Sequence, residues 1–149
     1  MRNGVHRLFC YGTLMFPGVM MRVAGSAGTM RAASLPGFGV YRFRGLPYPG
    51  LVACPGATAH GVLYEGLTMA QLRRLDAYEG ALYRRRRVMM EGCAVWTYVV
   101  APRYRHRLTS EGWDASRFAR QELGAYLARL GARLGRRPQR YYLHSPITA

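Results

Sequence analysis

The alternation of hydrophobic and polar residues along the first half of the chain predicts mainly strands. Residues 5–11 (VHRLFCY) are rich in aromatic and β-favouring side chains and end at a glycine, so we predict a buried strand that leads into a turn. A turn at Pro36-Gly37, a strand around residues 40–43 and a proline-rich loop over residues 46–50 are expected next. Residues 60–65 (HGVLYE) predict a further strand.

The pattern becomes helical after residue 67. Thr68 is followed three residues later by Gln71, a spacing typical of a capping box, in which each side chain binds a free backbone N–H of the first helical turn. We therefore predict a helix from about Met69 to Tyr78. Gly80 is its expected terminator, because glycine readily adopts the conformation that ends a helix.

A hairpin and a second helix are predicted in the last third of the chain. Residues 83–90 and 93–101 form two strand patterns joined by a tight turn at Glu91-Gly92. Asp114 or Ser116 is expected to cap a helix whose apolar stripe repeats at spacings of four, three and four: Leu123, Leu127, Leu130 and Leu134. The tail from about residue 135 shows no clear period, and residues 1–149 are interpreted as a single domain.

The composition excludes several classes of protein. Half of the residues are hydrophobic, which is enough for a folded core. The apolar stretch over residues 8–15 follows two arginines, as in a signal peptide, but Gly12 and Pro17 interrupt this pattern. The longest uncharged run, residues 45–64, is long enough to span a membrane, but prolines and glycines break it. We expect no membrane segment. Three cysteines without metal-ligand or redox spacing favour a reducing cytoplasm.

The charge balance is strongly positive. The chain has 22 basic residues, all of them arginine, and 7 acidic residues, for a formal net charge of +15. Such a charge attracts anions, including nucleic acids, whatever the fold. The densest run is Arg84 to Arg87, but alternate residues of a strand face opposite sides, so at most two of these arginines can contact one ligand. A solvated strand edge is the alternative interpretation of this run.

Glu79 is the candidate catalytic residue. It lies four residues after Leu75 and extends the core-facing side of the predicted helix, to which Leu72 also belongs. Burial raises the pKa of a carboxyl group, and the negative end of the helix dipole acts in the same direction, so Glu79 is suited to exchange a proton near neutral pH. The alternative is an acid at the helix end that pairs with Arg84 or Arg85 or simply faces solvent.

Two further features are candidates for the same site. Asp76 lies one helical turn before Glu79 and is either its partner in a carboxylate pair or a structural acid that binds a backbone turn or an arginine. Tyr11-Gly12-Thr13-Leu14 places a glycine directly after a strand, where a sharp turn leaves N–H groups in an anion-binding concavity. Four scattered histidines have no metal-ligand spacing, so we expect no metal site.

The order of these motifs resembles the AIG2-like branch of the γ-glutamyl cyclotransferase family, in which a strand ends in Y-G-T-L or Y-G-S-L and a later helix ends in L-D-x-x-E-G. Here these motifs are FCYGTLM at residues 9–15 and LDAYEG at residues 75–80, and the resemblance covers residues 7–127. It implies an α+β fold, with a small mixed β-barrel of about five to seven strands and a few external helices.

The resemblance also implies a reaction that needs no metal or organic cofactor. The α-amine of a small-molecule γ-glutamyl amide attacks its own γ-carbonyl and releases 5-oxoproline and a free amine or amino acid. By this resemblance Glu79 transfers the proton, the amides of Gly12, Thr13 and Leu14 bind the substrate carboxylate or the oxyanion, and Tyr11 lines the pocket. The alternatives are acyl transfer or hydrolysis in the same pocket, and a non-catalytic protein that binds nucleic acid or another polyanion. The leaving amine and the oligomeric state stay open.

Overall fold

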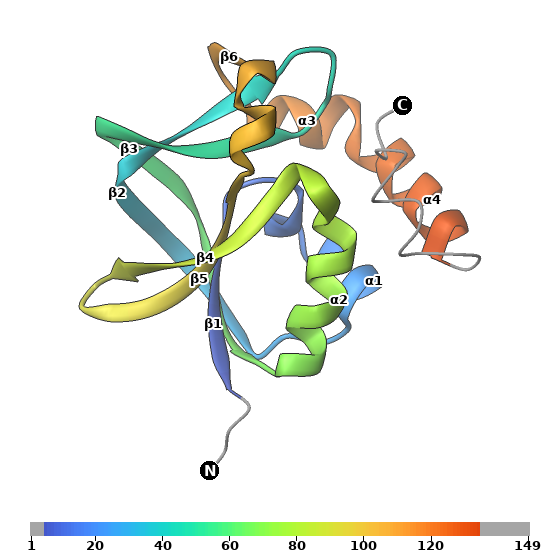
Figure 1. Ribbon diagram of the computed structural model, residues 1–149. Helices are drawn as coiled ribbons and strands as arrows, with labels where there is room; N and C mark the ends of the chain where they lie inside the picture. Colours follow the sequence, from blue (N-terminus) through green and yellow to red (C-terminus); the bar gives the residue numbers. More distant parts are fainter. Residues whose placement is uncertain (1–4, 135–149) are drawn as a thin grey trace.

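A mixed six-stranded sheet, curled into a half-barrel, forms the centre of the molecule (Figure 1). The computed structural model describes residues 5–134, and the unassigned tail from about residue 135 lies outside them. The strand order is β4-β5-β1-β3-β2-β6. Only β1 and β5 pair in parallel, and the other neighbours are antiparallel. The strands are β1 (His6–Cys10), β2 (Thr29–Phe43), β3 (Pro49–Leu67), β4 (Tyr83–Met90), β5 (Cys93–Val100) and β6 (Leu108–Gly112). The predicted fold class is confirmed.

β1 is buried on both faces because it runs through the middle of the sheet. Leu8 and Cys10 belong to the core that also contains the helices, whereas Phe9 and Tyr11 belong to a second core on the other face of the sheet. A strand that is covered on both faces does not have to alternate apolar and polar residues. This explains the continuous apolar run at its end, which the sequence analysis correctly assigned to a buried strand.

The long hairpin of β2 and β3 corrects three sequence predictions. The predicted turn at Pro36-Gly37 is wrong, because the pair lies inside β2, at an irregularity in the register with β3. The loop predicted over residues 46–50 ends earlier than expected, since its last two residues already pair within β3. The strand predicted over residues 60–65 is only the second half of β3, which has 19 residues. Proline and glycine mark bends in these strands rather than their ends.

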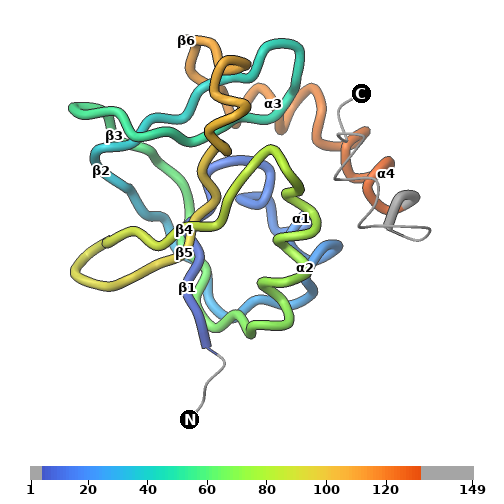
Figure 2. The backbone as a smooth tube through the Cα atoms, viewed as in Figure 1, coloured from blue at the N-terminus to red at the C-terminus, as the bar shows by residue number. Residues whose placement is uncertain are grey.

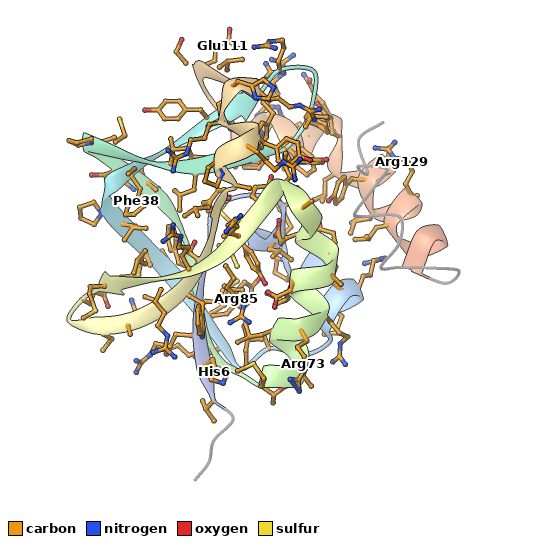
Figure 3. The ribbon with its side chains drawn as sticks, in the orientation of Figure 1. His6, Phe38, Arg73, Arg85, Glu111 and Arg129 are labelled. Carbon is orange, nitrogen blue, oxygen red and sulfur yellow. The ribbon has the colours of Figure 1, made fainter. Side chains whose placement is uncertain are left out.

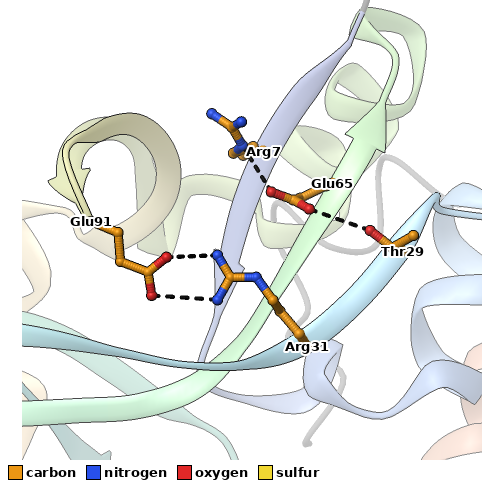
Figure 4. Close-up of polar contacts among 5 residues, drawn as sticks. All are labelled: Arg7, Thr29, Arg31, Glu65 and Glu91. Atoms are coloured by element: carbon orange, nitrogen blue, oxygen red, sulfur yellow. Dashed lines mark hydrogen bonds and ion pairs between the residues drawn. The ribbon is translucent and has the colours of Figure 1, made fainter.

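The β4–β5 hairpin forms as predicted and extends away from the helices (Figure 2). Its turn residue Glu91 binds Arg31 of β2 through two hydrogen bonds, of 2.7 and 3.4 Å (Figure 4). Three strands separate β2 from β4 in the sheet, so this ion pair joins distant parts of the sheet and is a consequence of its curvature. Both side chains are about half exposed, and the pair therefore contributes little stability.

Helix α2 (Met69–Glu79) agrees with the prediction to within one residue at its end. The capping box is present: Thr68 Oγ1 accepts a hydrogen bond from the Gln71 N–H at 3.1 Å, and the Thr68 N–H donates to Gln71 Oε1 at 2.9 Å. Gly80 ends the helix with a φ of 69°, in the left-handed region that glycine tolerates.

The other helices differ from the prediction. The expected second helix is divided into α3 (Ala115–Gln121), which Asp114 caps, and α4 (Leu123–Leu134). Helix α1 (Pro17–Ala24) was not predicted, although Val19, Met20, Val23 and Ala24 recur at helical spacing and form the face that is buried against the core. No helix within residues 5–134 is long and apolar enough to cross a bilayer.

Candidate active site

A cavity of about 250 Å³ lies where the end of β1 meets the C-terminal end of α2. Its wall includes five residues that the sequence analysis assigned to the site, Tyr11, Gly12, Thr13, Leu14 and Glu79, whereas Asp76 does not line it. Residues 81–83, which follow α2 and open β4, and segments from β3, β5, α4 and the 3-10 helix η3 (Pro102–Arg107) also line it. The structure thus brings the two motifs of the resemblance into one pocket, and the roles of the individual residues stay predictions.

The Tyr11-Gly12-Thr13-Leu14 turn forms the start of a short 3-10 helix, η1 (Thr13–Met15). The first hydrogen bond of this helix runs from the Met15 N–H to the Gly12 carbonyl at 3.0 Å, so the N–H groups of residues 12, 13 and 14 have no acceptor within it. A Cβ atom at Gly12 would lie 3.1 Å from two ring carbons of Pro49, which also lines the cavity. Glycine therefore keeps space open beside these amides.

Hydroxyl groups from three other elements hold this turn in place. Thr13 Oγ1 and the Tyr78 hydroxyl of α2 are hydrogen-bonded at 2.8 Å, and Tyr78 in turn is hydrogen-bonded to Tyr126 of α4. The Tyr64 hydroxyl of β3 donates to the Leu14 carbonyl at 2.9 Å. The turn is therefore fixed by contacts that extend to the C-terminal helix.

Glu79 is the last residue of α2 and is followed at once by the 3-10 helix η2 (Gly80–Leu82). Its side chain is partly buried, and within residues 5–131 it has no hydrogen bond and no ion pair. Burial, together with the nearby negative charge of Asp76, raises the pKa of Glu79 from a usual value of 4.5 to about 8. This carboxyl group can therefore release and recover a proton near neutral pH.

Arg85 binds Asp76 and not Glu79, and within residues 5–131 no ion pair joins Glu79 to Arg84 or any other arginine. The Arg85 guanidinium donates to both carboxylate oxygens of Asp76, at 2.7 and 3.0 Å, and the Tyr98 hydroxyl donates to one of them at 2.7 Å. Figure 3 shows Arg85 between the sheet and α2. Its guanidinium lies 4.3 Å from the ring centroid of Trp96. The structural interpretation of Asp76 is confirmed.

The acidic residues of this basic chain are mostly neutralised. Of the 7 acids, four lie in ion pairs with arginine: Glu65, Asp76, Glu91 and Glu111. A fifth, Asp114, caps α3. In a chain with 22 arginines, an acid such as Glu79, which lines a cavity and has no basic partner within residues 5–131, is unusual, and it is the kind of perturbed group that marks a functional site.

Seven tyrosines line the cavity, of which the sequence analysis assigned only Tyr11 to the site: Tyr11, Tyr48, Tyr78, Tyr83, Tyr98, Tyr104 and Tyr126. Burial raises the pKa of Tyr11, Tyr78 and Tyr83 well above the usual value, so their hydroxyls stay protonated. Tyr78 lies within the L-D-x-x-E-G motif and Tyr83 follows shortly after it, so the proximity of both residues to the motif was an available signal.

Two other pocket residues had no local signal. Tyr48 packs against the core and also lines the cavity. Arg107 lies at the end of η3, and nothing in the surrounding sequence connects it with Glu79. No group of three or more histidine, cysteine or acidic side chains that could hold a metal ion is found in the part of the chain that the structure describes.

Comparisons with known proteins agree with the motifs and the fold. The model of the family "Gamma-glutamyl cyclotransferase, AIG2-like" matches residues 8–115. Protein AIG2 B of Arabidopsis thaliana is 30% identical over 128 residues, which cover 82% of this chain and 75% of that protein. AIG2-like protein A of the same plant is 35% identical over 81 residues, which cover 54% of this chain and 49% of that protein. The chain thus spans about half the length of the second relative.

Solved structures show the same relationship. A solution structure of an Arabidopsis thaliana protein has a TM-score of 0.65 and 26% identity, and the match covers 93% of this chain and 98% of that one. A structure described as a gamma-glutamyl cyclotransferase shares the fold, with a TM-score of 0.56, 17% identity and coverage of 86% and 87%. By its family match, its relatives and its fold, the chain belongs to the AIG2-like γ-glutamyl cyclotransferase family.

Proposed function

We propose that this chain is an enzyme that cyclises the γ-glutamyl group of a small-molecule γ-glutamyl amide to 5-oxoproline and releases the amine. The observation that carries the proposal is that Glu79, partly buried and without a partner among the described residues, lies in the same cavity as the Tyr11-Gly12-Thr13-Leu14 turn. A cavity of about 250 Å³ suits a small substrate. Membership of the family supports the class of reaction.

The reaction exchanges one C–N bond for another and consumes no water. The α-amine nitrogen attacks the γ-carbonyl carbon, the ring C–N bond forms, and the amide bond to the leaving amine breaks. Glu79 accepts the proton that the attacking nitrogen loses and returns it to the leaving nitrogen. Its pKa of about 8 lets the same group act first as a base and then as an acid. Since both reacting groups belong to one molecule, holding it in a folded conformation supplies much of the rate.

In this proposal the backbone amides of Gly12, Thr13 and Leu14 bind the negatively charged part of the substrate. They stabilise the oxyanion that develops on the γ-carbonyl oxygen or bind the glutamyl carboxylate. Tyr11 forms the adjoining wall of the cavity. Its hydroxyl donates a hydrogen bond of 2.6 Å to the Tyr98 carbonyl. The free thiols of Cys10, Cys54 and Cys93 are consistent with a reducing compartment, and we propose the cytoplasm.

The test is to incubate the protein with a panel of γ-glutamylamines and γ-glutamyl amino acids and to measure 5-oxoproline. We expect turnover by the wild-type protein and its loss, by roughly 100-fold or more, in Glu79→Gln, a change that keeps the shape of the side chain. Glu111→Gln is the matched control, because Glu111 is an exposed acid outside the cavity. Equal rates in the wild-type and Glu79→Gln proteins would exclude the role of Glu79.

The products of the same incubation distinguish cyclisation from the alternative functions. Free glutamate in place of 5-oxoproline selects hydrolysis in the same pocket. Absence of both products, with salt-dependent binding to unrelated nucleic acids, selects a non-catalytic protein that uses its arginines to bind polyanions.

A further inference from the structure

The cavity contains two formal charges of opposite sign. Among the lining residues within the described part of the chain, only Glu79 and Arg107 carry a side chain that is charged in its usual ionised form at neutral pH. The other polar groups are hydroxyls, a thiol and backbone amides. The family motifs account for Glu79 and leave Arg107 without a role.

Arg107 lies at the rim of the cavity. Its side chain is exposed, whereas residues around Glu79 such as Tyr78 and Tyr98 are buried. Its backbone is fixed, because its carbonyl accepts a hydrogen bond from the Arg44 N–H at 2.8 Å. Its guanidinium lies 5.2 Å from the ring centroid of Tyr104, another lining residue. Within residues 5–131 it has no ion pair, so its N–H groups are available to a ligand.

The position of the two charges orients a substrate. The γ-carbonyl has to lie beside Glu79 for the proton transfer. With the glutamyl part held by the amides of the Tyr11-Gly12-Thr13-Leu14 turn, as proposed above, the leaving amine is the part that extends toward the rim and Arg107. A guanidinium binds a carboxylate through paired, charge-assisted hydrogen bonds and repels an ammonium group.

We propose that Arg107 binds a carboxylate on the leaving amine, so that the preferred substrates are γ-glutamyl amino acids or peptides rather than γ-glutamyl derivatives of neutral or cationic amines. This inference rests on the proposed function. Arg107 acts on the choice of leaving group and takes no part in the bond changes at the γ-carbonyl.

The experiment uses two compounds that differ by a single carboxylate, γ-glutamyl-alanine and γ-glutamyl-ethylamine. The ratio of their kcat/KM values measures the preference. We expect the wild-type protein to favour γ-glutamyl-alanine by about tenfold, Arg107→Gln to abolish the preference, and Arg107→Lys to retain part of it. Higher salt should reduce the wild-type ratio, because the carboxylate is bound at an exposed rim.

Arg103→Gln is the matched control. Arg103 also stacks on Tyr104, with its guanidinium 5.5 Å from the ring centroid, is exposed like Arg107, and does not line the cavity. The control should keep the wild-type ratio. If Arg107→Gln lowers kcat/KM equally for both compounds, Arg107 binds the glutamyl part or has a structural role, and the inference is overturned. A wild-type ratio near one overturns it as well.

A binding measurement distinguishes failure of the proposed cyclisation from failure of the inference about Arg107. The affinities of both compounds are measured by calorimetry in Glu79→Gln and in the double variant that also carries Arg107→Gln. Preferential binding of γ-glutamyl-alanine that requires Arg107, without 5-oxoproline from the wild-type protein, supports the inference and refutes the cyclisation. Equal affinities for the two compounds, or no binding of either, overturn the inference.

Discussion

Asp76 holds Arg85 through two hydrogen bonds, from Nε to Oδ1 at 2.7 Å and from Nη2 to Oδ2 at 3.0 Å. Glu79, one helical turn further along α2, has no such partner among the residues that the structure describes. The two carboxylates therefore differ in role because the arginine binds only one of them. Asp76 also raises the pKa of Glu79 by its negative charge, in addition to the larger effect of burial.

The raised pKa of Glu79 predicts a pH-dependent cost to stability. Between its unfolded pKa near 4.5 and its folded pKa of about 8, the folded chain retains a proton that the unfolded chain has released. The free energy of unfolding therefore falls as the pH rises through this window. Glu79→Gln removes the effect, so we expect it to be more stable than the wild-type protein by roughly 1–3 kcal/mol at about pH 9 and nearly equal at about pH 5.

Urea unfolding at the two pH values measures this difference. Glu111→Gln is again the comparison, because its carboxyl group is 70% exposed and should give the same small change at both values. A stability difference for Glu79→Gln that does not change with pH would contradict the raised pKa.

The same pKa predicts the pH dependence of turnover. If the ionised Glu79 is the base, kcat/KM rises with pH up to about 8. Asp76→Asn removes the neighbouring negative charge and leaves Arg85 unbalanced, and both changes lower the pKa of Glu79. The acidic limb of the profile should therefore shift to lower pH. Tyr98→Phe deletes a hydrogen bond to Asp76 without changing any charge, so its acidic limb should stay in place.

How much could be predicted from the sequence depends on how local each signal is. The capping box of α2 and the Glu91-Gly92 hairpin are set by neighbouring residues and were predicted to within one residue. The first half of β3 is held by its pairing with β2, and helix α1 by its packing against the core, and the composition of these two segments alone does not reveal either contact.

The residues of the site also divide into those with a local sequence signal and those without one. Glu79 and the Tyr11-Gly12-Thr13-Leu14 turn lie within short motifs and were found, whereas Arg107 and Tyr126 reach the cavity from η3 and α4. Their contribution depends on the tertiary arrangement alone. Periodicity places Tyr126 on an apolar stripe, which is also true of many core residues without any role in a site.

The capping box predicts a modest effect on stability that is separate from the site. Thr68→Ala removes the acceptor of the Gln71 N–H and should lower the free energy of unfolding by about 1 kcal/mol. Thr68→Ser retains the hydroxyl and should lose much less. Because Thr68 lies at the end of α2 opposite to Glu79, turnover at temperatures where both variants are folded should not change. A loss in Thr68→Ser as large as that in Thr68→Ala would show that the methyl group, not the cap, is responsible.

Tyr126 links α4 to the wall of the cavity by two kinds of contact that substitution can separate. Its ring is buried and packs edge-on against Phe118, with the ring centroids 5.5 Å apart, and its hydroxyl binds Tyr78. Tyr126→Phe keeps the ring and removes one hydrogen bond, so we expect a loss of about 0.5–1.5 kcal/mol. Tyr126→Ala also leaves a cavity in the core and should cost about 3–5 kcal/mol. Chemical denaturation of both variants measures the difference, and equal losses would mean that the ring contributes no packing and that α4 is held by the hydroxyl alone.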